Sequence, residues 1–364
     1  MRKKFTPILG FLGFLMLFLS VCTPARAELP DAHLPYWYVP TRFGTTGLYN
    51  LFGNDTVGPR GFSLGVYADF SKFALPVDPR DPELLDIRAV GTFGITERFE
   101  IGAAVPYVNL QADEEFGFPE IDESGIGDVS VVGKFRLVDD VGGVPGIGIF
   151  GLVSFPTGDE EKGLGSGSTD FRLGGIITKH LGPHQLYGNV SYFFSGEDDT
   201  VTANCAVAPI LAAGICTQGV FENALFYGGG IELTLARSET SRFAIFGEVD
   251  AFHETRSEDD EKESPLDEVD DGAQGLAGVR IGFANGLAFT AGWASRIAGE
   301  EPVPEAPLWR VFGGVTYTFA QKPAPPVPPT PPPTPTPTPP PPVVTPAPPP
   351  ANRCPEITSM TANP

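Results

Sequence analysis

Apolar and polar residues alternate along most of the chain, from about residue 61 to residue 320. A period of two places successive side chains on opposite faces of a strand, and segments of this length suit strands that cross a bilayer at a tilt. We predict twelve strands from this pattern, near residues 61–73, 84–96, 98–111, 127–138, 145–155, 168–181, 184–196, 221–236, 241–256, 271–284, 286–298 and 306–319.

The connections between these segments alternate between short and long. The short ones lie at Glu97, 139–144, 182–183, 237–240 and 285–286. The long ones, mostly acidic, lie at 74–83, 112–126, 156–167, 197–220, 257–270 and 299–305. Short periplasmic turns on one rim and long external loops on the other are typical of a bacterial outer-membrane barrel. The predicted fold class is therefore all-β, a transmembrane up-and-down antiparallel β-barrel over 61–320 with both chain ends in the periplasm.

The two faces of the predicted strands differ in polarity. In 127–138, Val131 and Phe135 share one face, whereas Lys134 and Arg136 share the other. A charge on the lipid face costs about 2–4 kcal/mol at the bilayer midplane, so we expect the apolar face to meet lipid and the charged face to meet the lumen. The residues predicted to line the lumen are Arg88, Lys134, Arg136, Asp170, Arg172, Glu248, Asp250 and Arg280.

The predicted lumen also carries phenylalanines, among them Phe150, Phe246 and Phe312. Its mixed charges fit cross-strand ion pairs that close the interior, and they fit a narrow polar pore equally well. Barrels of about 8 strands are filled by side chains and those of about 16–18 strands enclose water, so an intermediate strand number does not choose between the two.

The N-terminus has the pattern of a secretory signal peptide over residues 1–27. A basic start at Arg2 precedes an apolar run from Ile8 to Val21, and Ala25-Arg26-Ala27 is a small-residue cleavage site. Lipidation at Cys22 is the alternative, although the bulky Val21 disfavours it. No later segment is apolar enough for a transmembrane helix.

The formal net charge is −21, and removal of four basic leader residues without any acidic one makes it about −25. Such a chain is expected to repel nucleic acid. We expect the acidic loops to form a solvated rim. The alternative is a calcium or magnesium site that bridges to the phosphates of lipopolysaccharide, a partner expected together with the outer-membrane lipids, and no cofactor is predicted. The weak metal candidates are Asp259, Asp260, Glu261, Asp270 and Asp271.

Three cysteines follow the leader. Cys205 and Cys216 share one long connection, and because export delivers the chain to an oxidising compartment we predict a disulfide between them. Two free thiols are the alternative. Cys354 is left without a partner near the end of the chain.

Two regions flank the barrel. Residues 28–60 are aromatic-rich but broken by Pro and Gly, which fits a periplasmic plug, a segment packed on the rim, or a loosely ordered terminus. Residues 321–351 are mostly Pro with Thr, Ala and Val, and we predict an extended polyproline II linker there. Residues 352–364 read as the start of an incomplete further domain.

Nothing in the sequence favours catalysis. The four histidines, His33, His180, His184 and His253, show no neighbouring serine that would build a lipase-type triad. We therefore interpret them as rim and girdle residues, and we predict that the protein is not an enzyme.

Several short motifs carry a family resemblance. Gly127-Asp128-Val129, Lys134-Phe135, the run Phe155 to Asp159 and the run Gly167 to Phe171 resemble the outer-membrane barrels named after the meta-pathway of phenol degradation. The resemblance covers roughly 61–320 and implies a passive barrel that admits hydrophobic or aromatic compounds, without catalytic residues.

A second resemblance concerns the layout of the chain. A barrel that ends at Tyr317-Thr318-Phe319 and continues into a Pro-rich linker resembles OmpA-like proteins, whose next domain binds peptidoglycan. The leading hypothesis is thus a passive outer-membrane channel or transporter for small solutes, hydrophobic ones included, gated by its acidic loops. The alternative is a structural outer-membrane anchor with a closed lumen that tethers a peptidoglycan-binding module.

Overall fold

The computed structural model describes residues 38–72, 82–114, 120–196, 223–254, 271–298 and 307–319. Apart from a single short 3-10 turn, η2 (Glu160–Lys162), the regular structure in these ranges is β-strand. The strands are β1 (Phe62–Lys72), β2 (Glu83–Gly94), β3 (Phe99–Ala112), β4 (Ile121–Ile126), β5 (Val129–Val138), β6 (Gly146–Phe155), β7 (Asp170–Leu181), β8 (His184–Phe194), β9 (Ala224–Arg237), β10 (Ser241–Glu254), β11 (Asp271–Phe283), β12 (Leu287–Ala298) and β13 (Trp309–Phe319).

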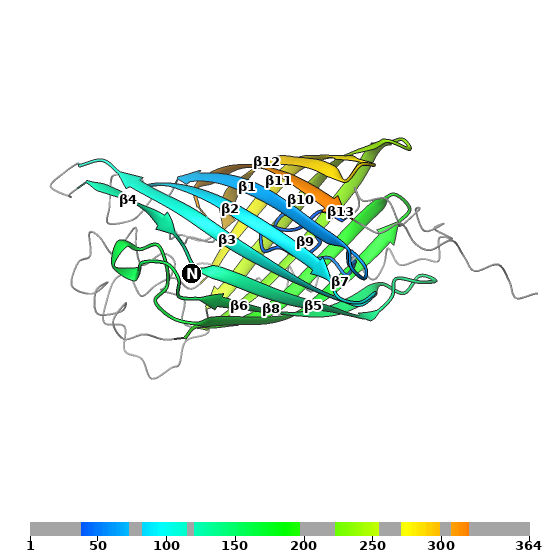
Figure 1. The fold of residues 1–364 in the computed structure, drawn as a ribbon, viewed down its shortest axis with the longest axis horizontal. Helices are drawn as coiled ribbons and strands as arrows, with labels where there is room; N and C mark the ends of the chain where they lie inside the picture. The colour runs from blue at the N-terminus through cyan, green and yellow to red at the C-terminus, as the bar shows by residue number, and fades with distance from the viewer. Residues whose placement is uncertain are drawn as a thin grey trace, which may run out of the picture. The chain divides into compact units, whose positions relative to one another are not determined.

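These strands close into an antiparallel barrel. Each strand pairs with the strands before and after it in sequence, except that β3 pairs with both β4 and β5. The ring closes where β1 pairs with β13, from Phe62↔Phe319 to Lys72↔Trp309. Figure 1 shows β13 beside β1, where the ends of the sheet meet. Because β4 and β5 share one position in the ring, the thirteen strands make twelve positions. The predicted all-β, up-and-down barrel is confirmed.

The fourth position of the ring is a broken strand. Tyr107 of β3 pairs with Ile126 of β4, whereas Ala104 of β3 pairs with Ser130 of β5, so the register shifts across Gly127-Asp128. The expectation of a loop throughout 112–126 is therefore wrong for its last residues. β3 is long enough to pair with both pieces, and this partner outweighs the acidic composition of β4, which by itself reads as a loop.

The outer face of the barrel is apolar. Leu64, Leu173 and Ile297 are among the large apolar side chains there, each 57–61% exposed. Aromatic residues gather at both rims, where Phe62 stacks on Phe319 at 4.2 Å between ring centroids. An apolar belt of this size between aromatic rims suits lipid and would be costly in water.

The inner wall is built from aromatic rings that lie over glycines of the adjacent strand. A Cβ added to Gly314 would lie 2.1 Å from the Tyr67 ring, and one added to Gly278 would lie 2.5 Å from the Phe246 ring. The same contact joins three further register pairs, Phe312 with Gly292, Phe252 with Gly272, and Phe150 with Gly174. Because the rings lie against the wall, the middle of the lumen is left for another part of the chain.

Candidate functional site: a filled lumen beneath a cup

Residues 38–60, called here the lumen segment, lie among the inward side chains of the barrel. The segment folds back on itself through the bridges Pro40↔Thr46 and Gly47↔Phe52, and it is the dark blue coil between the strands in Figure 1. Leu48, Tyr49 and Phe52 are at most 2% exposed. The segment is thus part of the buried interior, and the wall residues that hold it define the candidate site.

The first contact centres on an ion pair at the level of the short turns. Glu100 of β3 and Lys134 of β5 lie 2.9 Å apart, with side chains at most 1% exposed. Glu100 accepts from the backbone N–H of Thr46 at 2.8 Å and of Val57 at 2.9 Å. Lys134 donates to the carbonyls of Thr46 at 2.9 Å and Asp55 at 2.6 Å. The segment's backbone therefore supplies partners to both buried charges, as buried ions require.

A second carboxylate holds the segment from the opposite side. Glu248 of β10, 2% exposed, accepts from the backbone N–H of Tyr49 at 2.5 Å and of Asn50 at 3.0 Å. The Asn50 side chain donates to Asp250 of the same strand at 3.0 Å. This tight turn of the segment is therefore fixed by two carboxylates that share the inner face of β10.

A third network joins three strands beneath the segment. Glu232 of β9 pairs with Arg242 of β10 and, at 2.9 Å, with Arg280 of β11. Arg280 also donates to the carbonyl of Gly47 at 3.2 Å. All three charged side chains are at most 3% exposed. The ion cluster closes the interior between these strands and reaches the segment through one hydrogen bond.

The segment brings a cation of its own to the wall. Arg42 lies 3.1 Å from Asp86 of β2 and 3.6 Å from Asp69 of β1. The Tyr49 hydroxyl donates to Asp69 at 2.6 Å, and the Tyr49 ring stacks on Phe312 of β13 at 3.9 Å. Apolar stacking and charge pairing thus act on the same turn of the segment.

An amide side chain of β8 pairs with the segment like a strand neighbour. Asn189 accepts from the N–H of Phe52 at 2.7 Å and donates to the Phe52 carbonyl at 2.9 Å. The Phe52 ring packs on Phe150 of β6 at 4.4 Å. A single wall residue therefore satisfies both backbone groups of a buried position, which would otherwise be costly.

A histidine ties the segment to a short turn. The ring nitrogens of His180 lie 3.0 Å from Asp140 and 3.1 Å from Asp55. Burial by itself would raise the pKa of Asp55, but the adjacent His180 and Lys134 lower it to about 2. Burial likewise opposes ionisation of Asp140, while hydrogen bonds from His180 and Lys179 hold its pKa below the ordinary value. Both carboxylates are therefore ionised at neutral pH.

Glycines on the inner wall make room for the segment. A Cβ on Gly102 would lie 2.5 Å from the backbone of Gly44, whose own φ of +99° suits glycine. A Cβ on Gly230 would lie 2.7 Å from Leu48. At these positions the wall and the segment approach too closely for any side chain.

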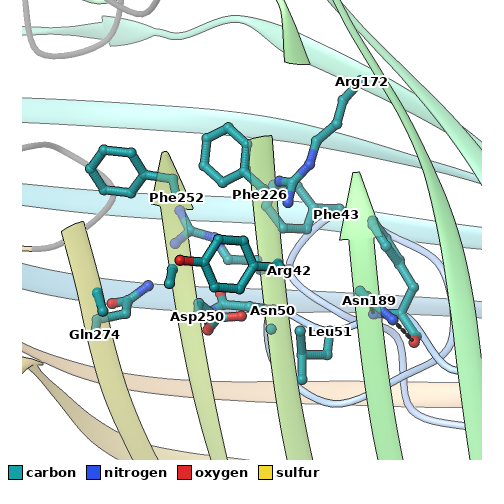
Figure 2. Close-up of a pocket in the computed structure, with 15 residues that line it drawn as sticks. Arg42, Phe43, Asn50, Leu51, Arg172, Asn189, Phe226, Asp250, Phe252 and Gln274 are labelled. Atoms are coloured by element: carbon teal, nitrogen blue, oxygen red, sulfur yellow. Dashed lines mark hydrogen bonds between the residues drawn. The ribbon is translucent and has the colours of Figure 1, made fainter. Parts of the chain in front are cut away.

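A cup lies above the segment, in the half of the lumen nearer the long connections (Figure 2). The segment's Arg42, Phe43 and Leu51 border it on one side, and Phe226 and Phe252 come from the strands. Its cavity volume is about 50 Å³, room for only a few water molecules at about 10–15 Å³ each. The remaining lining residues are Asn50, Phe52, Arg172, Asn189, Tyr227, Gly228, Asp250, Ala251, Ala273 and Gln274.

The family motifs build the connection between β6 and β7. Asp128 accepts from the N–H of Gly158 at 3.0 Å and of Ser166 at 2.7 Å. The Thr157 hydroxyl donates to the carbonyl of Gly127 at 2.8 Å. Leu164, 1% exposed, packs against the strand break at Gly127. These motif residues therefore fix a folded connection at the broken strand.

Five of the residues predicted to line the lumen meet the segment or the cup. Lys134, Glu248 and Arg280 hydrogen-bond the segment, and Arg172 and Asp250 border the cup. Asp250 also binds the segment through Asn50.

The other three predicted lumen residues serve local contacts. Asp170 accepts from the hydroxyls of Ser166 and Ser168, each at 2.9 Å. Arg136 pairs with Asp139 at the short-turn rim. Arg88 pairs with Asp86 at 2.5 Å, beside Arg42.

The remaining site predictions lie outside what the structure describes. In the described ranges no cluster of three or more His, Cys, Asp or Glu residues could hold a metal ion. The predicted disulfide, the metal candidates, the leader, and the tail with its OmpA-like layout fall on residues whose structure or side chains are not described, namely 1–37, Cys205, Cys216, Asp259, Asp260, Glu261, Asp270, Asp271 and 320–364.

Sequence reasoning missed Asp69, Asn189 and Gln274 as site residues. Each is a polar residue at an inward position of its strand, so the alternation of inward and outward positions alone could have identified it. Sequence reasoning placed His180 at the short-turn rim but did not find its two partners, Asp140 of a short turn and Asp55 of the segment.

The closed barrel and its apolar belt define an outer-membrane-type β-barrel. Over residues 82–222 the chain matches the family model described as "Putative MetA-pathway of phenol degradation", which confirms the resemblance seen in the motifs for that region. No curated protein matches the sequence. Among the described residues, no helix is long and apolar enough to cross a membrane.

Solved barrels provide further likenesses. The COG4313 outer membrane channel from Pseudomonas putida F1 is 13% identical over 73% of this chain and 98% of its own, with a TM-score of 0.49. The translocator domain of the autotransporter NalP from Neisseria meningitidis is 12% identical over 72% and 89%, with a TM-score of 0.41. The CymD monoaromatic hydrocarbon channel is 9% identical over 72% and 89%, with a TM-score of 0.39. None of these likenesses assigns a solute to this chain.

Proposed function

We propose that the protein is a passive outer-membrane channel for small hydrophobic solutes, gated by the lumen segment. The observation that carries the proposal is the cup, a cavity with aromatic walls that is bordered by the segment itself. Small-molecule sites are mostly apolar with a few placed polar groups, and this cavity combines both. The family match over residues 82–222 supports the same class of function.

The gate has to be the segment, because it contacts inward groups on most strands of the ring. A solute that reaches the cup meets Leu51 and Phe52, which are at most 3% exposed. Passage would require the segment to shift within the lumen or to withdraw toward the short-turn rim. In our proposal that rim and both chain ends face the periplasm, so withdrawal would be toward the periplasm.

A cross-link between segment and wall tests the gate. A Cβ built on Gly146 lies 3.4 Å from the Cβ of Asn54, close to the roughly 3.5–4.5 Å of disulfides. We would introduce Asn54→Cys and Gly146→Cys into the full chain with its native cysteines changed to serine. Uptake of an uncharged aromatic solute into proteoliposomes would be measured with the pair oxidised and then reduced, and each single variant would serve as control.

The outcomes separate the parts of the proposal. We expect uptake in the reduced protein and loss of uptake in the oxidised protein. Equal uptake in both states would show that solutes bypass the segment. No uptake in the reduced pair, in the single variants or in the unmodified chain would contradict the channel itself.

A closed structural anchor is the second candidate, and the buried ion networks favour it. Glu100, Lys134, Glu232 and Glu248 are each at most 2% exposed and are held by the segment or by one another. Opening the lumen would separate the segment from these charges, and a buried charge that loses its partners is strongly destabilised. In this candidate the barrel would fix the Pro-rich tail to the outer membrane, and through a module beyond Pro364 to peptidoglycan. A barrel that takes up no solute in the uptake experiment would support the anchor.

A further inference from the structure

One nitrogen of the Arg296 guanidinium, on β12, has no acceptor among the described residues. Arg296 lies at an inward position of β12. Its Nη1 atom is shielded from solvent and has no hydrogen-bond partner among the residues that the structure describes. A buried donor left unsatisfied carries its full desolvation penalty, which a bound acceptor relieves. The position therefore favours a ligand that carries an acceptor group.

The register places Arg296 beside the cup. Arg296 pairs with Gln274 of β11, and Gln274 lines the cavity. The Gln274 side-chain oxygen accepts from Arg310 at 3.2 Å. The edge of the cup toward β12 and β13 is therefore rich in guanidinium and amide donors.

A second arginine faces the cup from β7. The guanidinium of Arg172 lies 4.3 Å from the centre of the Phe226 ring, and its Nε donates to Ser191 at 2.8 Å. Figure 2 shows Arg172 and Phe226 together at one end of the cup, with Asp250 toward the other end. Arg172 and Arg296 each lie two residues inside the long-connection ends of their strands. Both cations therefore lie near the long-connection ends of their strands.

Aromatic side chains lie between the two arginines around the ring. Phe226 of β9 and Phe252 of β10 lie 5.9 Å apart between ring centroids, and Phe43 of the segment adds a third ring to the lining. Rings at such spacing accept another flat ring by stacking or edge contact. The order around the wall is thus cation, aromatic, aromatic, amide, cation.

We propose that the cup binds small aromatic carboxylates, with the ring among Phe43, Phe226 and Phe252, beside Arg172, and the carboxylate toward Arg296. This rests on the proposed function, because it names the solute class of the same cavity. Arginine suits a carboxylate through paired, charge-assisted hydrogen bonds, and aromatic rings suit the other end of such a solute.

Binding must widen the cavity, because about 50 Å³ is less than an aromatic ring occupies. Arg172 and Phe226 are half-buried, and Arg172 and Phe252 lie two residues from the long-connection ends of their strands, so we expect the cup to widen at this end. The segment beneath them does not have to move for the cup to open upward.

Calorimetric titration of the full chain in detergent micelles tests the proposal, with benzoate as the probe at neutral pH. Benzyl alcohol lacks the charge and cyclohexanecarboxylate lacks the aromatic ring, and empty micelles correct for partitioning. Arg296→Gln removes the guanidinium whose Nη1 atom has no partner among the described residues, and Arg172→Gln removes the guanidinium over the Phe226 ring. Arg98→Gln is the matched control, because Arg98 pairs with Asp139 at the short-turn rim, 50% exposed.

We expect saturable benzoate binding that is at least about ten-fold weaker in Arg296→Gln, weakened by a smaller factor in Arg172→Gln, and unchanged in Arg98→Gln. Cyclohexanecarboxylate and benzyl alcohol should each bind more weakly than benzoate. Absence of benzoate binding, equal affinity in Arg296→Gln, or tighter binding of benzyl alcohol would each overturn the proposal.

The same titration on the oxidised Asn54→Cys/Gly146→Cys protein separates this proposal from the channel. Benzoate should still bind when the segment is locked, because the cup lies above it. Binding without any uptake would leave the solute class intact and contradict the channel. Uptake of uncharged aromatics without benzoate binding would leave the channel intact and contradict the solute class.

Discussion

The two halves of the lumen are built differently, although the same strands form both. In the half near the short turns, Glu100, Lys134, Glu232 and Arg280 are buried, and each charge has an opposite charge in contact. In the half near the long connections, aromatic rings and arginines surround a small cavity. One half has the chemistry of a protein core, and the other has the chemistry of a binding site.

The lumen segment produces this difference. It enters only the short-turn half and the middle of the barrel, where its backbone N–H and C=O groups satisfy the wall charges. Above Phe43 and Leu51, side chains of β7, β9, β10 and β11 border a small cavity. Wall charges therefore have different surroundings in the two halves: below they contact the backbone of the segment, and above Arg172 and Asp250 border the cavity.

The largest expected effect comes from Lys134→Met. The change leaves Glu100 buried without its cation and removes the donor to two segment carbonyls. We expect a loss of about 3–5 kcal/mol in the free energy of unfolding, measured by urea titration in micelles. Arg98→Met, which breaks an exposed pair with Asp139, should cost less than about 1 kcal/mol. Similar small losses in both would mean that the segment is not held at this site.

A smaller effect is expected from Gly102→Ala. The added Cβ would meet the backbone of Gly44 and Thr45 at 2.5–2.9 Å, so the segment itself has to move. We expect a loss of about 1–3 kcal/mol and faster hydrogen exchange within 38–60. Gly133→Ala on the neighbouring strand is the control, since its Cβ would meet only Phe99 at 3.6 Å. Unchanged exchange in Gly102→Ala would contradict the close contact.

Lowering the pH should destabilise the contacts of the lumen segment, by less than Gly102→Ala does. Asp55 has a pKa of about 2 in the folded protein, below its ordinary 3.8, so its contribution is complete above about pH 4 and is lost as the pH falls toward 2. We expect hydrogen exchange within 38–60 to be slower in the unmodified protein than in Asp55→Asn at pH 5. Near pH 2 the two proteins should exchange at the same rate. Comparison at equal pH removes the intrinsic pH dependence of exchange. A constant difference between the two proteins would contradict the contact with His180.

The barrel could be predicted from sequence because its signals are local. Alternation along each strand and turns such as Asn285-Gly286 determine strand positions without knowledge of partners, and the observed bounds of β6 and β8 differ from the predicted ones by at most two residues. β4 was missed because Asp122 and Glu123 make its composition that of a loop. Only its pairing with β3 makes it a strand.

The site was less predictable, because it depends on where a segment without periodicity lies. The alternation of the strand places Lys134 on the inner face, yet it does not say that Lys134 would meet Thr46, 88 residues away in sequence. The path of residues 38–60 is set by tertiary contacts with many strands. One usable signal was present, since inward glycines such as Gly228 and Gly230 indicate a close approach by another part of the chain.

The smallest effect on stability, and the sharpest contrast between the halves, is expected from Phe226→Leu. Phe226 is half-buried and borders the cup, so a smaller apolar side chain should cost less than about 1.5 kcal/mol in the free energy of unfolding. Removal of the ring beneath Arg172 should nevertheless weaken retention of an aromatic solute, measured by titration or uptake. Phe52→Leu, a similar change at a residue 2% exposed in the segment, should show the reverse order, with the larger loss in stability. If both variants lost stability equally and both bound solute equally, the lumen would be one continuous core rather than a core beneath a binding site.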